Sequence, residues 1–190
     1  MRVIPFVLVL LALAGCSEPP LKELDEARSA IDAAQAAGAE QYAAEEYAGA
    51  TITLQKARAS LDERDYRQAL SYAIDARQRA IEASRVVPDA RARAKTAAEA
   101  DLKSVTDSVS HLESALHAAA EAGVSAQELL APSETVDAAK GSLQEARTAL
   151  DARKYLEATA LLRGVRENVD GAAKTVSSIS QRAKSKRRTG

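Results

Sequence analysis

The chain has 190 residues and a formal net charge of −1, with 28% charged and 46% hydrophobic residues. It holds 43 alanines, no tryptophan and one phenylalanine; this composition argues against the core of a globular enzyme and for long helices, because alanine is the strongest helix former. The single cysteine, Cys16, excludes a disulfide within the chain.

The first predicted element is a secretory signal over residues 1–15. After a basic start, residues 3–15 are apolar or small, and this run is shorter than the about 20 residues that a membrane-spanning helix needs. The run ends at Leu13-Ala14-Gly15-Cys16, which resembles the lipobox of bacterial lipoproteins at all four positions. An ordinary signal peptide followed by an incidental cysteine is the alternative.

The lipobox resemblance implies processing and an anchor. It implies cleavage between Gly15 and Cys16, loss of residues 1–15, and acylation of Cys16, which then cannot act as a nucleophile. Residues 16–20 become the lipidated cysteine and a short tether. Several acyl chains hold a protein stably on a bilayer, whereas one chain binds marginally. Ser17 resembles the residue found in outer-membrane rather than inner-membrane cargo, which implies the periplasmic face of the outer membrane.

The remainder of the chain predicts about four to five helices, and a sequence repeat organises them. The first helix carries apolar residues on one face and ends near Gly38, a common helix stop. Residues 54–69 and 143–158, offset by 89, are identical at 9 of 16 positions. Each copy predicts two amphipathic helices that meet at a short polar corner, 62–65 in the first copy and 151–154 in the second.

Apolar residues in both copies alternate steps of three and four, which average 3.5 and are typical of a left-handed coiled-coil seam. The sequence therefore predicts an all-α fold of elongated antiparallel helical hairpins with coiled-coil-like alanine and leucine seams. The predicted seam residues are Leu24, Ala27, Ile31, Ala34; Tyr47, Ala50, Leu54, Ala57, Leu61; Tyr66, Ala69, Ala73, Ala76, Ala80, Ala83, Val87; Ala98, Leu102, Val105, Val109, Leu112, Leu116, Ala119; Val136, Ala139, Leu143, Ala146, Leu150; and Tyr155, Ala158, Leu162, Val165, Val169, Ala172, Val176, Ile179, Ala183.

Pro88 leaves one helix boundary open. A proline inside a helix removes a hydrogen bond and kinks the helix, but it can also separate two helices. The apolar pattern continues through Ala90 and Ala94 and favours one kinked helix from about 66 to 122, roughly 85 Å long.

The second copy is predicted to begin with a loop. After a helix stop at Gly123, residues 124–133 form this loop, and Ser133 caps a helix over 134–152. The predicted domains are thus 21–123, the first hairpin repeat with a long connecting helix; 124–180, the second repeat; and 181–190, a basic tail.

Charge is divided between the body and the tail. Residues 17–180 carry 20 basic and 27 acidic residues, a net charge of −7. The tail carries five bases and no acid: Arg182, Lys184, Lys186, Arg187 and Arg188. These bases predict contact with lipopolysaccharide phosphates, peptidoglycan carboxylates or an acidic envelope protein, with a solvated terminus as the alternative. Nucleic acid is not expected, because no aromatic residues interleave the bases for stacking.

The pattern of the first copy resembles a family, the domain-of-unknown-function family 4398. The resemblance covers 27–84 best, and 116–176 more weakly, since Lys154 replaces the expected aspartate; it rests on Leu54, Ala57, Leu61, Asp65, Tyr66 and Ala69. Members are mostly short bacterial lipoproteins or periplasmic proteins, some with an OmpA-like domain, so the resemblance implies fold and compartment rather than an activity. Residues 65–76 also resemble the second helix of a tetratricopeptide repeat, but the period is 89 instead of 34.

No motif predicts an enzyme, a metal site or a cofactor other than the covalent lipid on Cys16. The pairs Asp107/His111 and Glu113/His117 have the i, i+4 spacing of two metal ligands each, and are interpreted as helix-surface partners. The sequence therefore predicts a lipid-anchored periplasmic spacer, adaptor or scaffold of the cell envelope. The alternative is a peptide- or ligand-binding module with tetratricopeptide-like helices.

Overall fold

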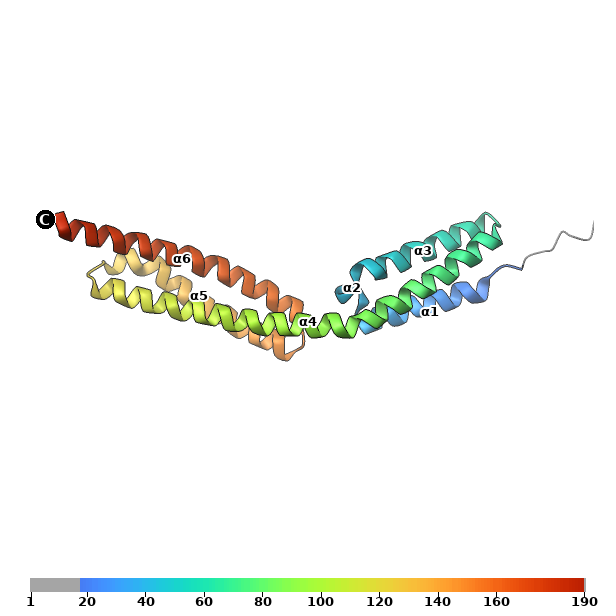
Figure 1. The fold of residues 1–190 in the computed structure, drawn as a ribbon, viewed down its shortest axis with the longest axis horizontal. Coiled ribbons are helices and arrows are strands. Elements are labelled where there is room, and N and C mark those ends of the chain that lie inside the picture. The colour runs from blue at the N-terminus through green and yellow to red at the C-terminus, as the bar shows by residue number, and fades with distance from the viewer. Residues whose placement is uncertain (1–17, 190) are drawn as a thin grey trace, which may run out of the picture. The chain divides into compact units, whose positions relative to one another are not determined.

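The computed structural model describes residues 18–189, and nearly all of them are helical (Figure 1). The all-α class is confirmed. The predicted cleavage and lipidation at Gly15 and Cys16 lie outside the described residues. The helices are α1 (Leu21–Ala37), α2 (Ala39–Tyr42), α3 (Ala44–Asp62), α4 (Tyr66–Glu121), α5 (Ala126–Asp151) and α6 (Tyr155–Thr189).

The described residues form six helices instead of the four to five predicted, because the short helix α2 is separate from α1 and α3. Gly38 ends α1 as predicted, in the left-handed region with a φ of 98°. Five residues later Ala43, with a φ of −144°, separates the short helix α2 from α3. Ala39 and Ala43 are buried, so this short helix is part of the packed structure.

Two compact units divide the chain, and their boundary between Ala90 and Arg91 lies inside α4. The N-terminal unit contains α1 to α3 and the first part of α4, and the C-terminal unit contains the second part of α4 with α5 and α6. This division differs from the predicted one at 123/124. The reason is that the second part of α4 buries Val105, Val109 and Leu112 against α5 and α6, as the first helix of that unit.

The N-terminal unit is held by a seam of small residues. α3 runs antiparallel to α1 and to the first part of α4 (Figure 1). On α4 the seam is almost entirely alanine, and each alanine buries little area, so the helices must approach closely to gain stability. An ion pair of 2.9 Å joins Arg77 of α4 to Glu26 of α1. The fully buried alanines in this first part of α4 are Ala69, Ala73, Ala76, Ala80 and Ala83.

The C-terminal unit has larger seam residues on the same plan. α5 runs antiparallel to α6 and to the second part of α4 (Figure 1). Asp101 of α4 accepts a hydrogen bond of 2.7 Å from Arg166 of α6. Lys140 of α5 forms an ion pair with Glu113 of α4. The hydrogen bond to the Glu113 carboxylate, and the negative charge of that carboxylate, raise the pKa of Lys140. The larger buried residues include Leu143 on α5 and Leu162, Val165, Val169, Val176 and Ile179 on α6.

The two predicted corners are tight turns with the same backbone bonds. After α3, the Asp65 amide donates to the Ser60 carbonyl (2.9 Å) and the Arg64 amide to the Leu61 carbonyl (3.0 Å). After α5, the equivalent bonds run from Lys154 to Ala149 and from Arg153 to Leu150. This is the Schellman pattern that satisfies the last carbonyls of a helix. Both helix ends and both following helix starts keep the offset of 89.

The start of α5 corrects the predicted loop over 124–133. α5 begins at Ala126, Ser125 is its N-cap in place of the predicted Ser133, and Pro132 lies inside the helix. The Ser125 hydroxyl accepts from the Glu128 amide (3.3 Å), and the Glu128 carboxylate accepts from the Ser125 amide (3.3 Å), which is a capping box. Burial of Pro132 in the core offsets the backbone hydrogen bond that a proline cannot donate.

The long helix predicted through Pro88 is confirmed as the continuous helix α4. Pro88 is exposed, and no residue of α4 between Val87 and Ala98 is buried. The core contacts of α4 are therefore interrupted on both sides of the unit boundary. A kink at Pro88 stays a prediction.

Candidate functional site

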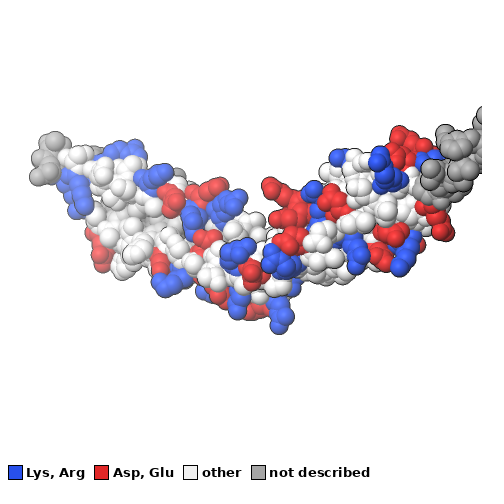
Figure 2. Space-filling view, turned by 45° about the vertical axis from the view of Figure 1, so that its right-hand side comes forward, with Lys and Arg blue, Asp and Glu red and all other residues white. Residues whose placement is uncertain are grey.

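The predicted basic tail continues α6 as a helix to Thr189. Arg182, Lys184 and Arg187 are exposed on its last turns, while the side chains of Lys186 and Arg188 lie outside the described part. Figure 2 shows blue basic side chains near the end of the molecule where α6 finishes, and mixed charge along the rest of the visible face. The bases are therefore held on a helix, at fixed spacing.

An open hollow of about 440 Å³ lies beside this part of α6. Arg182 and Arg187 are the basic residues that line it, so the structure brings together two of the predicted contact residues. Lys184 is on the same turns but does not line the hollow. The remaining lining residues are Gly123, Val124, Glu128, Ile179 and Ala183.

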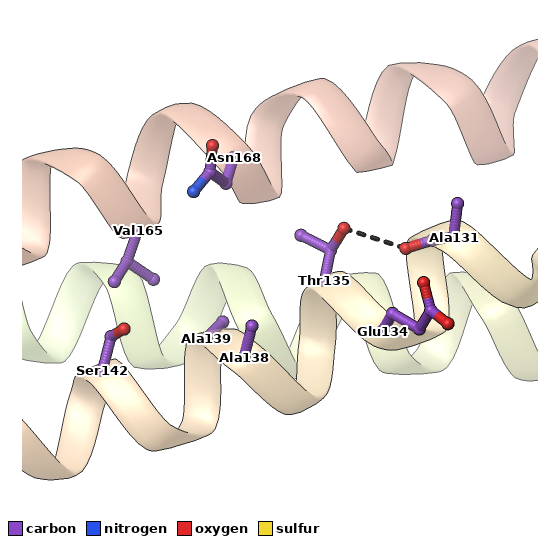
Figure 3. A pocket seen from close by; sticks show the side chains of 8 residues that line it. All are labelled: Ala131, Glu134, Thr135, Ala138, Ala139, Ser142, Val165 and Asn168. Carbon is purple, nitrogen blue, oxygen red and sulfur yellow. Dashed lines mark hydrogen bonds between the residues drawn. The ribbon is translucent and has the colours of Figure 1, made fainter.

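A second open region is a groove between α5 and α6, made of two adjoining hollows of about 360 and 290 Å³. Thr135 lines both hollows, and its hydroxyl donates to the Ala131 carbonyl at 2.9 Å, so α5 itself satisfies the hydroxyl. Figure 3 shows Asn168 on α6 across from these α5 residues, with Val165 beside it. No Lys or Arg lines either hollow in the described structure, whereas Glu134 lines one and Glu167 the other.

Small residues make this groove, and their spacing follows the helices. On α5 they recur as Ala131, Thr135, Ala138 and Ser142. On α6 they recur as Asn168, Gly171 and Thr175, in line with Gly164. A β-carbon at Gly164 or Gly171 would meet nothing within 4 Å. The groove is thus parallel to both helices and open to solvent at the glycines.

The repeat supplies an internal comparison for the groove. Subtracting 89 converts Ala138, Gly164 and Asn168 of the C-terminal unit into Gly49, Asp75 and Arg79 of the N-terminal unit. There Arg79 donates to Asp75 at 3.0 Å, and its guanidinium lies 3.6 Å from the place of a β-carbon on Gly49. A large ion-paired side chain therefore covers the N-terminal position that is open in the C-terminal unit. The seam pattern does not predict the groove, because the pattern marks buried positions only.

Three members of the two carboxylate–histidine pairs have charged partners outside those pairs. Asp107 pairs with Lys103 at 3.1 Å, Glu113 with Lys140, and His117 with Glu121 at 3.7 Å. In the part of the chain that the structure describes, no three His, Cys, Asp or Glu side chains gather in a way that could hold a metal ion. The helices of that part also lack a segment long and apolar enough to cross a bilayer.

Comparison with known proteins identifies one region. The model of the family DUF4398, a domain of unknown function, matches residues 22–104. This match includes the region 27–84, where the sequence resembled the family best, and it covers less than half of the chain. Comparison with curated proteins and with solved structures gives no match. The match to the DUF4398 model thus covers most of the N-terminal unit and the start of the C-terminal unit.

Proposed function

We propose that the protein is a lipoprotein of the bacterial outer membrane whose helical units face the periplasm and serve as a spacer or adaptor. The observation that carries the proposal is Leu13-Ala14-Gly15-Cys16 at the end of an apolar run. α1 begins at Leu21, only five residues after Cys16, so a lipid on that cysteine would tie the helical part closely to the bilayer.

The packing of the described helices supports a structural role. The core consists of alanine, leucine and valine seams, and exposed or half-buried ion pairs join neighbouring helices. The exposed bases at the end of α6 give the adaptor a place to meet a negatively charged envelope component, such as lipopolysaccharide, peptidoglycan or an acidic protein. None of these features supplies a nucleophile with a base, so we propose a non-catalytic function.

Processing and detergent partition test the proposed anchor. Cys16→Ser removes the thiolate that accepts the lipid, so we expect the variant to carry no acyl chains and to retain residues 1–15, which raises the mass of its polypeptide. Ser17→Ala keeps the thiol and is the matched control, expected to partition as the wild type does. If Cys16→Ser partitions and is processed like the wild type, the anchor proposal fails.

A second candidate function is binding of a helical peptide in the groove between α5 and α6. The specific observation that favours it is the loss, in the C-terminal unit only, of the side chains that fill the equivalent place in the N-terminal unit. Small residues let a third helix approach closely, and the acids Glu134 and Glu167 favour a basic peptide.

Restoring the N-terminal pattern tests this candidate. Gly164→Asp with Asn168→Arg copies Asp75 and Arg79, and should close the groove without a change of net charge. In cells, the double variant should no longer crosslink to the basic proteins that the wild type captures through α5 and α6. The matched control, Ala173→Asp with Ser177→Arg, has the same spacing on exposed positions of α6 outside the groove and should keep them. Equal capture by both double variants would remove the groove as a binding site.

A further inference from the structure

The hollow beside the end of α6 combines positive charge with an apolar floor. The floor is formed by Val124 and Ile179, which are 7% and 8% exposed, and by the half-buried Ala183. Arg182 and Arg187 line the same hollow. A ligand that fits both parts needs an anionic group joined to an apolar group.

The geometry keeps the two guanidinium groups available. Arg182 donates through Nε to the Ser178 carbonyl at 3.4 Å, and no ion pair is formed by Arg182 or Arg187 with any described residue whose side chain is placed. The acid of the hollow, Glu128, accepts from the hydroxyl of Ser125 at 2.8 Å as well as from its amide in the capping box. Glu128 thus has a structural role at the start of α5.

Gly123 leaves room for the guanidinium of Arg187. A β-carbon on residue 123 would lie 2.6 Å from Nη2 of Arg187, which is closer than real contacts allow, and Gly123 also has a φ of +79°. The turn after α4 therefore has room for a guanidinium because it carries no side chain. A side chain at this position would require the guanidinium of Arg187 to shift from its present place.

The two guanidinium groups of Arg182 and Arg187 favour a phosphate as the ligand. A guanidinium has planar N–H donors that match two oxygens of a phosphate, and two arginines can share one group of charge −1 to −2. After Asp170 the chain has no acid, and its last 20 residues carry six bases, so the local potential also favours an anion. The apolar floor distinguishes a phosphate that bears acyl chains from a free ion.

We propose that this hollow, lined by Arg182, Arg187, Val124, Ile179 and Ala183, binds the phosphate of a phospholipid with the start of its acyl chain on the apolar floor. This inference names a ligand for the basic residues in the proposed function, and rests on that function only for the compartment in which the lipid is met. The experiment uses the full chain with Cys16→Ser, so a failed anchor does not affect its outcome.

The probe is dihexanoyl phosphatidic acid below its micellar concentration, titrated into the protein by calorimetry. Inorganic phosphate and dihexanoyl phosphatidylcholine are the comparison ligands. We expect phosphatidic acid to bind more tightly than both of them, because only it offers an exposed phosphate and an acyl chain together. Equal binding of inorganic phosphate would reject the lipid and leave a free-anion site.

Substitutions locate the binding. Arg182→Ala and Arg187→Ala should each weaken binding of phosphatidic acid about tenfold or more, the scale for losing a hydrogen bond to a charged group. Lys184→Ala removes the same charge from the same turns outside the hollow, and should change affinity less than about twofold. Ala183→Leu keeps every charge, fills the floor and should also weaken binding. An equal effect of Lys184→Ala and the arginine variants, or no effect of Ala183→Leu, would overturn the proposal.

Discussion

Two arginines adopt a backbone conformation that usually belongs to glycine. Arg64 has a φ of 62° and Arg153 a φ of 61°, both in the left-handed region of the turn that ends a helix. The left-handed conformation costs an L-residue about 1–2 kcal/mol, and glycine avoids that cost. The sequence predicted both corners from the repeat but not their conformation, because the usual glycine signal is missing at these positions.

The cost of these arginines predicts a stabilising change. Arg64→Gly and Arg153→Gly should each raise the free energy of unfolding by up to about 1 kcal/mol, because the gain in the turn exceeds the larger entropy of glycine in the unfolded chain. Urea denaturation measures this change in the free energy of unfolding. Glu63→Gly is the control: Glu63 has a right-handed φ of −76°, so the same glycine should destabilise there. Destabilisation by all three would contradict the assigned turn.

At the scale of the element, the seams predicted from the 3.5-residue spacing agree with the observed packing, since every predicted seam residue is buried or half-buried. The prediction succeeded because a long helix has one apolar face and the repeat shows it twice. The predicted start of α5 is wrong: a proline such as Pro132 favours a loop, but Ser125 and Glu128 have the spacing of a helix-start signal and cap the helix before it. A buried proline in a well-capped helix is not visible from propensity alone.

Two leucines of α5 test the seam directly. Leu143 is 4% exposed and Leu130 is 57% exposed, so the same substitution can be compared on the two faces of one helix. Leu143→Ala should lower the free energy of unfolding by about 2–5 kcal/mol, as expected for a fully buried leucine. Leu130→Ala should change it by less than about 0.5 kcal/mol. Similar effects at both positions, measured by urea denaturation, would contradict the assigned face of α5.

At the scale of the whole molecule, the two units with related sequences have α4 in common. The last helix of the first unit continues as the first helix of the second, so the chain needs no loop at that boundary. The offset of 89 predicted the equivalent corners. It did not predict the unit boundary, because only packing shows that the second part of α4 belongs with α5 and α6. Nor did it predict the groove, which depends on positions where the two copies differ.

The proposed lipid on Cys16 would anchor these helical units, and the mass of the mature N-terminal peptide shows whether that lipid is present. The protein is purified from membranes of cells that express the full chain, then digested and analysed by mass spectrometry. We expect a peptide that begins at Cys16 and carries the added mass of a diacylglyceryl group and an acyl group on its amine. A peptide that begins at Met1, or a Cys16 with a free thiol, would contradict it.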